Sequence, residues 1–278
     1  MRFSIFGFLA ALWLPTALPA QTLERISETG EMVIGYREDA APLSYLSNNQ
    51  PQGYAPTLCF QLARQIGEQL ALEELDVLFE PVDTENRFEK VASGEIDLLC
   101  GAATITLERR EIVDFSDPVY VDGTTVAIKT GGPETLDALA GQKVGVRSGT
   151  TTLDALTNTL AAQNIDAEIV QFADHPSGLA ALEGDAVVAY FADQSILMNM
   201  VLSKENADDF EVLPEIMTVE KHGLALARGD TEFRLAVDRG LAALHRDGVV
   251  REIFEQTVPG AQPGFGLEAM FLLAPTLQ

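Results

Sequence analysis

Residues 96–118 combine a strand with residues that could bind an anion. The stretch opens with a continuous apolar run, turns at Gly101, exposes the hydroxyl of Thr104, and offers Thr106 as a helix start. In an open α/β sheet, ligands bind beyond the carboxyl ends of the strands, and helix amino-termini there favour anions. The stretch therefore predicts the floor of a binding site.

The elements that must position this stretch alternate in type. We expect a strand over 31–36, a small hairpin within 42–54, a helix from Pro56 and a strand over 75–81. A short helix follows, capped by Asp83 or Thr84 and stopped at Gly94, and then a strand over 96–100. This β-α-β-α-β order calls for a parallel sheet covered on both faces.

After Pro118 the chain begins a second βα series. Strands are expected over 143–147, 167–172, 186–190 and 211–213, with helices over 135–140, from the turn 148–152 to 162, over 175–183 and from Asp193. Two long β-like runs, 123–129 and 222–227, are candidate crossing segments between lobes. An amphipathic helix from Thr231, a short helix over 249–256 and a Pro/Gly-rich segment over 259–266 complete the chain.

The pattern predicts an α/β fold of two similar lobes joined by two crossing strands, the second lobe inserted in the first. We expect a signal peptide over 1–20, a first lobe over 21–125 and 223–278, and a second lobe over 126–222. Such a pair of lobes can hinge around a cleft.

The charge balance limits the partners. The formal net charge is −24, which disfavours nucleic acid and anionic lipid surfaces. A small anionic ligand would be repelled at long range and needs a local cluster of arginines to hold it. Most of the acidic residues also serve as a solubilising surface.

Residues 1–20 have the layout of a signal peptide, with Arg2, an apolar stretch and the small-residue end Pro19-Ala20. No later segment approaches a spanning length, so we expect a soluble, exported protein. An oxidising compartment permits a disulfide between Cys59 and Cys100, and the equal alternative is two small buried hydrophobes. The cysteines and scattered histidines have no zinc-ligand spacing, so no metal or cofactor is predicted.

Three separated motifs carry a resemblance. CGAATITLERREIVDFSDP at 100–118, VRSGTT at 146–151 and FADHPSGLAALEGDAVVAYFADQ at 172–194 are similar to the family 3 extracellular solute-binding proteins. These are periplasmic amino-acid receptors of ABC importers, and the chain most resembles their glutamate/aspartate-binding group from about residue 22 to 256. The resemblance implies a type II periplasmic-binding fold, a monomer in the periplasm, capture by lobe closure and delivery to an ABC permease in the inner membrane.

The resemblance also implies how an α-amino acid would be held. Arg109 matches the position that binds the α-carboxylate, with help from Thr104 and Thr150, since a guanidinium matches a carboxylate in a bidentate way. Asp193 matches the position that accepts the α-ammonium. Thr151 and Ala102 complete the neighbourhood, although relatives commonly carry a hydroxyl where Ala102 stands. The alternatives are that Arg109 faces solvent from a helix, as we expect for Arg110, and that Asp193 is a plain helix N-cap.

Four further residues, Arg37, Thr84, Arg87 and His175, match positions around the distal carboxylate in the glutamate/aspartate group. Two extra arginines fit a ligand with a second negative charge, because a neutral ligand would leave them desolvated and unpaired. The alternative is that each arginine pairs with an acid such as Glu38 or Glu85. Counting Arg37, Arg87 and Arg109 against Asp193 gives a local charge of +2, to which a protonated His175 would add.

Other functions are kept open. Some proteins of this fold resemble periplasmic dehydratases, and His175 or Asp193 could then act as acid or base. No Ser/His/Asp order or phosphate loop supports catalysis, so no catalytic residue is predicted. A sensory module would need a membrane span and an output domain, which the sequence does not show. The sequence does not decide between glutamate, aspartate and another polar amino acid.

Overall fold

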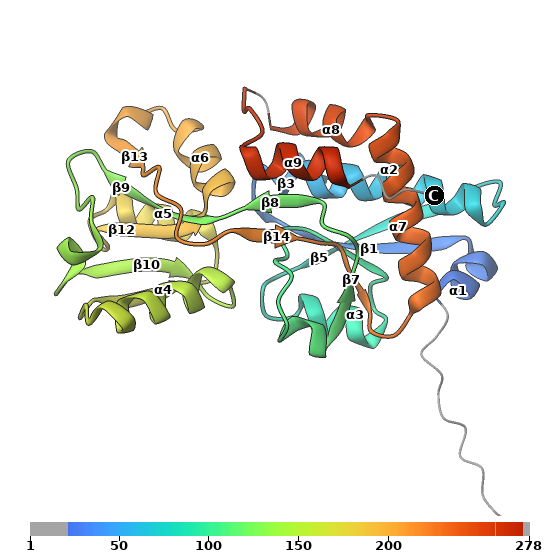
Figure 1. Ribbon diagram of the computed structural model, residues 1–278, viewed down its shortest axis with the longest axis horizontal. Coiled ribbons are helices and arrows are strands. Elements are labelled where there is room, and N and C mark those ends of the chain that lie inside the picture. Colours follow the sequence, from blue (N-terminus) through green and yellow to red (C-terminus); the bar gives the residue numbers. More distant parts are fainter. Residues whose placement is uncertain (1–21, 259, 275–278) are drawn as a thin grey trace, which may run out of the picture.

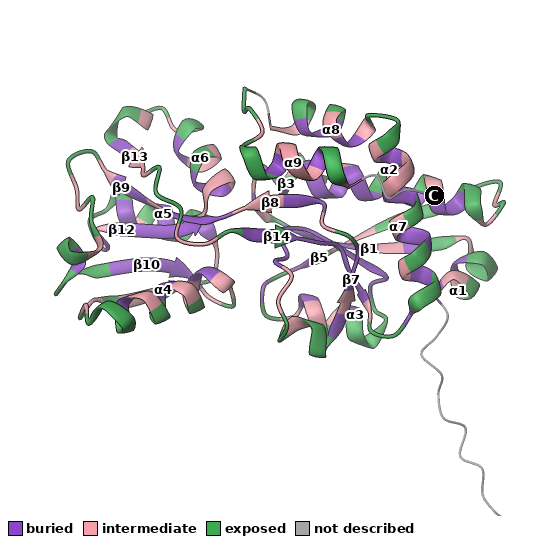
Figure 2. Cartoon of the chain, in the orientation of Figure 1, coloured by how far each residue is buried: buried purple, intermediate pink, exposed green. Residues whose placement is uncertain are grey.

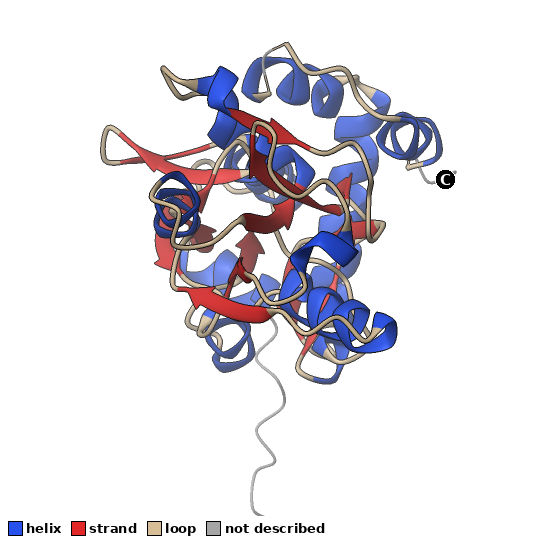
Figure 3. Ribbon diagram, turned by 90° about the vertical axis from the view of Figure 1, so that its left-hand side faces the viewer, coloured by secondary structure: helices blue, strands red, loops and turns tan. Residues whose placement is uncertain are grey.

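The computed structural model describes residues 22–258 and 260–274, so the predicted signal peptide lies outside the described residues. The described chain forms two lobes side by side, each built on one five-stranded sheet (Figure 1). Viewed from the second-lobe end, strands occupy the middle and helices lie outside them (Figure 3). The predicted α/β class with two lobes is confirmed. The lobe boundaries given above stay a prediction.

The first-lobe sheet is centred on β1 (Glu31–Arg37). Its strand order is β5 (Asp76–Val82), β1, β6 (Leu98–Cys100), β15 (Ala225–Ala227) and β7 (Val113–Phe115). β1 pairs in parallel with both β5 and β6, as the β-α-β-α-β pattern predicted, whereas β15 is antiparallel to its neighbours. The α-helices of this lobe are α1 (Thr22–Thr29), α2 (Tyr54–Gln69), α3 (Arg87–Ser93), α7 (Thr231–Arg246), α8 (Val249–Thr257) and α9 (Phe265–Leu273).

The second-lobe sheet repeats this design around β10 (Lys143–Arg147). Its order is β11 (Glu168–Phe172), β10, β12 (Ala189–Asp193), β9 (Thr124–Lys129) and β13 (Phe210–Val212). β11 and β12 pair with β10 in parallel, and β9 pairs with β12 antiparallel. The helices are α4 (Thr151–Gln163), α5 (His175–Glu183) and α6 (Gln194–Leu202), with 3-10 turns at Leu136–Leu139 and Ala207–Asp209.

A two-stranded antiparallel ribbon joins the lobes (Figure 1). It consists of β8 (Tyr120–Asp122) and β14 (Glu220–His222), with Asp122 opposite Glu220 in the register. The crossing segments therefore lie earlier in the sequence than predicted. The run 123–129 belongs to β9 inside the second sheet, and the run 222–227 breaks at Gly223 into β14 and β15.

Local sequence signals explain several other elements. The hairpin of β3 (Ser44–Ser47) and β4 (Gln50–Gln52) turns at Asn48 and Asn49, which both have positive φ, as a two-residue primed turn requires. A short strand β2 (Asp39–Ala40) pairs with β3. The apolar stripe predicted on α7, comprising Phe233, Val237, Leu241 and Leu244, is buried. Figure 2 shows buried residues concentrated in the two sheets and on the helix faces towards them.

Several boundaries differ from expectation. The helix expected over 135–140 is a 3-10 turn, and α3 has Asn86 at its N-cap position instead of Asp83 or Thr84. The helix expected after Thr106 is a single 3-10 turn, Arg109–Glu111, because the chain re-enters the sheet at once as β7. The strand expected over 186–190 is β12, displaced towards the carboxyl end by its pairing with β9, in which Asp193 lies opposite Thr124. Asp193 is thus the last residue of a strand.

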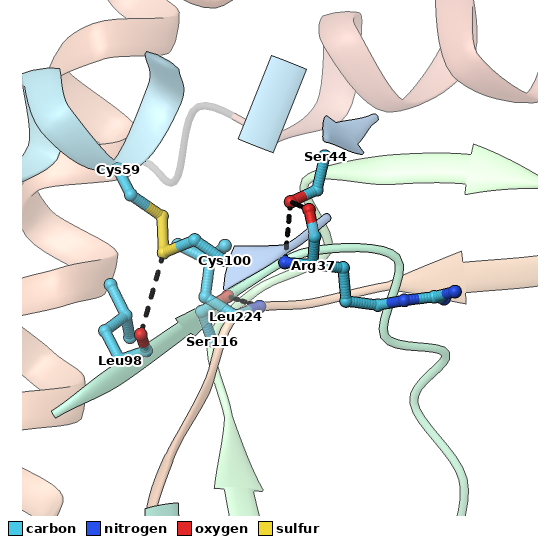
Figure 4. The surroundings of a disulfide bond; sticks show 7 residues. All are labelled: Arg37, Ser44, Cys59, Leu98, Cys100, Ser116 and Leu224. Atoms are coloured by element: carbon cyan, nitrogen blue, oxygen red, sulfur yellow. Dashed lines mark hydrogen bonds between the residues drawn. A yellow bond between two sulfur atoms is a disulfide. The ribbon is translucent and has the colours of Figure 1, made fainter. Parts of the chain in front are cut away.

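Cys59 and Cys100 form a disulfide, with a Cα–Cα distance of 6.3 Å, which decides between the two alternatives for the cysteines. The bond ties α2 to the end of β6, close to the end of β1 where the Ser44 hydroxyl bonds the backbone of Arg37 (Figure 4). The tail forms α9, whose Leu267 and Phe271 join the first-lobe core. Across residues 22–258 and 260–274, no helix is both long and apolar enough to cross a membrane.

Candidate functional site

A small cavity of about 20 Å³ lies between the lobes. Both lobes contribute to its wall, and its lining is unusually rich in arginine and threonine. The lining residues are Arg37, Arg87, Ala102, Thr104, Arg109, Arg147, Thr150, Thr151, Thr152, His175, Phe191, Ala192, Asp193 and Ile196. Every site residue predicted from the sequence is in this set except Thr84.

Strand ends place the charged side chains. Arg37 is the last residue of β1, Arg147 the last of β10 and Asp193 the last of β12. The carboxyl ends of parallel strands meet at one edge of a sheet, and here the edges of the two sheets face each other across the cavity. The strand boundaries therefore determine which charged side chains line the cavity.

Arg37 and Arg147 share one carboxylate across the lobes. Nε and Nη2 of Arg37 donate to Oδ1 of Asp39 at 3.0 and 2.7 Å, and Nε of Arg147 donates to Oδ2 at 2.6 Å. The two guanidinium groups hold the pKa of Asp39 below its usual range, although burial opposes ionisation. The acid that pairs with Arg37 is thus Asp39, and neither Glu38 nor Glu85 takes that place.

Arg87 and Arg109 differ from that pair. Arg87 is buried and donates to the carbonyls of Ala102 and Gly149 at 3.1 and 3.3 Å, and its Nε has no hydrogen-bond partner among the described residues. Arg109 donates to the carbonyl of Thr104 at 2.8 Å. Both guanidinium groups contact the ring of Phe88, whose centroid lies 4.8 Å from Cζ of Arg87 and 5.1 Å from Cζ of Arg109. Within the described chain neither arginine forms an ion pair with a carboxylate. Arg109 is partly buried and lines the cavity, so it is not the solvent-facing helix arginine considered as its alternative, whereas Arg110 is exposed.

The amino-terminus of α4 faces the cavity. Thr150 caps the helix, because its hydroxyl accepts from the amide of Leu153 at 3.3 Å and donates to the carbonyl of Arg147. Thr151 and Thr152 follow in the first turn and also line the cavity. Free amides and the helix dipole make this end favourable for a carboxylate. Any contribution of Thr150 to an anion would come from its backbone, since the hydroxyl is engaged.

Asp193 precedes α6 but makes no side-chain capping bond, so it is not the plain N-cap considered above. Burial raises the pKa of its carboxyl well above the usual value, and the nearby Asp122 and Glu220 add to this effect. Its Oδ2 lies 3.6 Å from Nε2 of His222, whose pKa burial lowers to about 4. Asp193 is therefore a half-buried carboxyl whose close basic neighbour His222 is a neutral imidazole, and an ammonium group supplied by a ligand would favour its ionised, accepting form.

His175 supplies no charge near neutral pH. It is buried at the start of α5, and its Nδ1 lies 3.0 Å from the hydroxyl of Tyr190. Burial, together with Arg37 and Arg147, lowers the pKa of His175 to about 3, although Asp39 opposes this. The added positive charge that a protonated His175 would bring is thus absent.

Thr84 is the predicted residue that the cavity lining does not include. Its hydroxyl donates to the carbonyl of Ser148 at 3.0 Å and bonds the guanidinium of Arg147. Both partners belong to the second lobe. The structure therefore places Thr84 in a contact between the lobes instead of on the cavity wall.

Sequence reasoning missed Arg147, Asp39 and Glu220. Arg147 had a usable signal, since it ends a predicted strand as Arg37 does. Asp39 lies two residues after Arg37, which is a local signal, but its bond to Arg147 joins the lobes, as the hydroxyl bonds of Glu220 join distant segments, and such pairings leave no trace in local sequence. Arg147 adds one positive charge to the site, and Asp39 and Glu220 add two negative charges beside it.

Asp193, Glu220 and His222 could in principle hold a cation, because one possible ligand atom of each lies within 4.8 Å of the others. Both oxygens of Glu220 already accept two hydroxyl bonds each. An ammonium group, which needs acceptors and no open coordination position, fits this corner better than a metal ion.

Two α/β lobes on a two-stranded hinge, with strand ends and a helix amino-terminus lining a cavity between them, define the type II periplasmic-binding class. Within that class, the chain belongs to the bacterial extracellular solute-binding proteins, family 3, whose model matches residues 32–259.

Several named proteins are similar to this chain. The L-glutamate/L-aspartate-binding protein of Pseudomonas aeruginosa is 29% identical over 260 residues, 92% of this chain and 86% of that protein. The glutamate/aspartate import solute-binding protein of Salmonella typhimurium is 28% identical over 259 residues, again 92% and 86%. Among solved structures, an ancestral amino acid-binding protein, a precursor of cyclohexadienyl dehydratase, matches with a TM-score of 0.74 and 25% identity, covering 85% of this chain and 99% of that one.

Proposed function

We propose that this protein captures an acidic amino acid, glutamate or aspartate, between its lobes and delivers it to an ABC permease. The observation that carries the proposal is the pair Arg87 and Arg109, two cavity cations without a carboxylate partner among the described residues, facing the acceptor Asp193. A ligand with two carboxylates and one ammonium has a net charge of −1. Its two carboxylates match the two unpaired arginines, and its ammonium matches Asp193.

The proposed pose assigns each end of the ligand to a group of residues. Arg109 and the amides at the start of α4 bind the α-carboxylate, with the backbone of Thr104 beside them, and Asp193 accepts from the α-ammonium. Arg87, with Arg37 and His175, surrounds the distal carboxylate. A neutral ligand would leave Arg87 buried without a counter-charge, which costs several kcal/mol.

Contacts across the cleft support capture by closure. Arg147 reaches Asp39, Thr84 reaches the carbonyl of Ser148, and Arg87 reaches the carbonyl of Gly149. Each of these bonds joins one lobe to the other, so the bonds form as the lobes meet. Closure then surrounds the ligand with protein dipoles and gives a permease one defined surface to recognise.

Export to the periplasm and a monomeric state are part of the same proposal. The Cys59–Cys100 disulfide fits an oxidising compartment, and the family is an extracellular one. We infer binding without catalysis, because the relatives named above are solute-binding proteins. Recovery of a chemically altered ligand after long incubation would contradict this inference.

The test is calorimetry of the mature protein with glutamate, aspartate, glutamine, asparagine and aliphatic amino acids. We expect the two dicarboxylates to bind at least about 100-fold more tightly than their amides, which corresponds to about 2.7 kcal/mol. Tightest binding of glutamine or an aliphatic amino acid would overturn the assignment.

A further inference from the structure

Glu220 is a buried carboxylate on the hinge strand β14 that collects hydroxyl groups. Its Oε2 accepts from Thr104 at 2.6 Å and from Thr151 at 2.7 Å. Its Oε1 accepts from Thr218 at 2.7 Å and from Thr124 at 3.1 Å. Burial opposes its ionisation, but the hydroxyl bonds outweigh burial and lower the pKa of Glu220. The carboxylate is therefore ionised and can only accept.

Counting protons fixes the direction of these bonds. Each threonine hydroxyl has one proton to donate and two lone pairs. Because ionised Glu220 has no proton, the protons of Thr104 and Thr151 must both point at Oε2. The two hydroxyl oxygens lie 3.3 Å apart, and neither proton remains for the other oxygen or for the cavity. Both residues line the cavity, so both offer it acceptor lone pairs alone.

We propose that Glu220 is a positioning residue that fixes the hydroxyl protons of Thr104 and Thr151, so that both oxygens accept from the ammonium group of the ligand. The inference rests on the proposed function, because it requires a ligand with an ammonium group. It adds a residue that controls the affinity for the ligand without touching it, because Glu220 acts through the threonines that line the cavity.

The arrangement also couples ammonium recognition to lobe closure. Thr104 follows β6 in the first lobe, Thr151 opens α4 in the second, and Glu220 lies on the ribbon between them. Both hydroxyls reach the same oxygen of Glu220 when the lobes are in contact. In an open form, a threonine that leaves Glu220 can turn its proton towards solvent. The acceptor pair is then incomplete.

The decisive variant is Glu220→Leu, which removes both acceptor oxygens. The hydroxyls of Thr104 and Thr151 then lose the acceptor that fixes their protons, and a proton that turns towards the cavity opposes an ammonium. We expect affinity for L-glutamate to fall about 30-fold. Affinity for glutarate, which has the same two carboxylates and no amine, should change less than about threefold when measured by displacement of L-glutamate. An equal loss for both ligands would mean that Glu220 merely holds the lobes together, and would overturn the proposal.

A double-mutant cycle with Thr151→Val gives a second reading. Each single change should weaken L-glutamate binding. The affinity of the double variant for L-glutamate should be about tenfold higher than the product of the two separate losses predicts. Independent losses would overturn the proposal. Matched controls are Glu252→Leu, an exposed glutamate of α8, and Thr157→Val, an exposed threonine of α4; both should bind like the unmodified protein. Failure of the unmodified protein to bind glutamate or aspartate would contradict the proposed function instead.

Discussion

Arginines in the same cavity are held in two different ways. Arg37 and Arg147 lie in opposite lobes and share the carboxylate of Asp39, so half of their charge is already neutralised. Arg87 and Arg109 lie in the first lobe, bond backbone carbonyls and share the ring of Phe88. The first pair forms a bridge between the lobes. The second pair keeps its charge available.

The difference teaches how a protein with a formal net charge of −24 can bind an anion. Paired guanidinium groups shape the cavity and contribute little field, because Asp39 compensates them. Unpaired ones are costly to bury and become favourable when a ligand supplies the missing carboxylates. Binding should therefore depend most on Arg87 and Arg109, and the stability of the ligand-free protein most on Asp39.

The largest expected effect is that of Arg109→Ala. Loss of the guanidinium removes a charge-assisted contact to the α-carboxylate, and we expect affinity for every amino acid ligand to fall more than about 1,000-fold. Arg109→Lys should restore only part of it, because an ammonium cannot bind in a bidentate way. Calorimetry measures both, and tight binding by the alanine variant would refute the role of Arg109.

Arg87→Met should weaken binding of the distal carboxylate and leave binding of the α-carboxylate unchanged. We expect affinity for glutamate to fall about 100-fold, with a change of less than about threefold for glutamine, whose distal end is neutral. The ligand-free variant should also be more stable, by about 1 kcal/mol, because an uncompensated buried cation has been removed. Calorimetry and urea unfolding are the measurements. Lower stability together with unchanged selectivity would show that Arg87 is a structural residue.

Asp39→Asn should act in the opposite sense on stability. It leaves Arg37 without its negative partner, and Arg147 as well when the lobes are in contact, and we expect a loss of about 2 kcal/mol in the free energy of unfolding. Glutamate affinity should change less than about tenfold, since the unpaired arginines are intact. Glu38→Gln, which alters the neighbouring acid, is the matched control. A larger effect on binding than on stability would reverse the distinction between the pairs.

The smallest effect concerns His175, which faces Arg37, Arg147 and Asp39. The unfolded chain takes up a proton at this side chain below pH 6.5, while the folded protein does not until about pH 3. Its contribution to folding is therefore undiminished above pH 6.5 and is lost as the pH falls. Relative to His175→Gln, the unmodified protein should lose about 1 kcal/mol between pH 7 and pH 5.5 in ligand-free urea unfolding. A constant difference across this range would mean that the folded-state pKa is not depressed.

The sequence was a good guide wherever local pattern fixes the backbone. Strand ends bear the charged residues, Asn48-Asn49 makes the hairpin turn, and α7 buries its apolar stripe. Where partners come from distant segments, the prediction failed: β12 moved three residues because β9 pairs with it, and the crossing ribbon formed from the residues just before the expected runs. Apolar periodicity marks an element but does not select its partner.

By itself, the sequence determined the two-lobed class and a cleft with Arg37, Arg87, Arg109 and Asp193 at the ends of predicted elements. Tertiary structure alone decided which charges are compensated, because the Asp39–Arg147 bond and the hydroxyls around Glu220 join segments far apart in the chain. Electrostatic compensation depends on distances of a few ångströms. Such distances are set by the packing of the lobes, which no local pattern records.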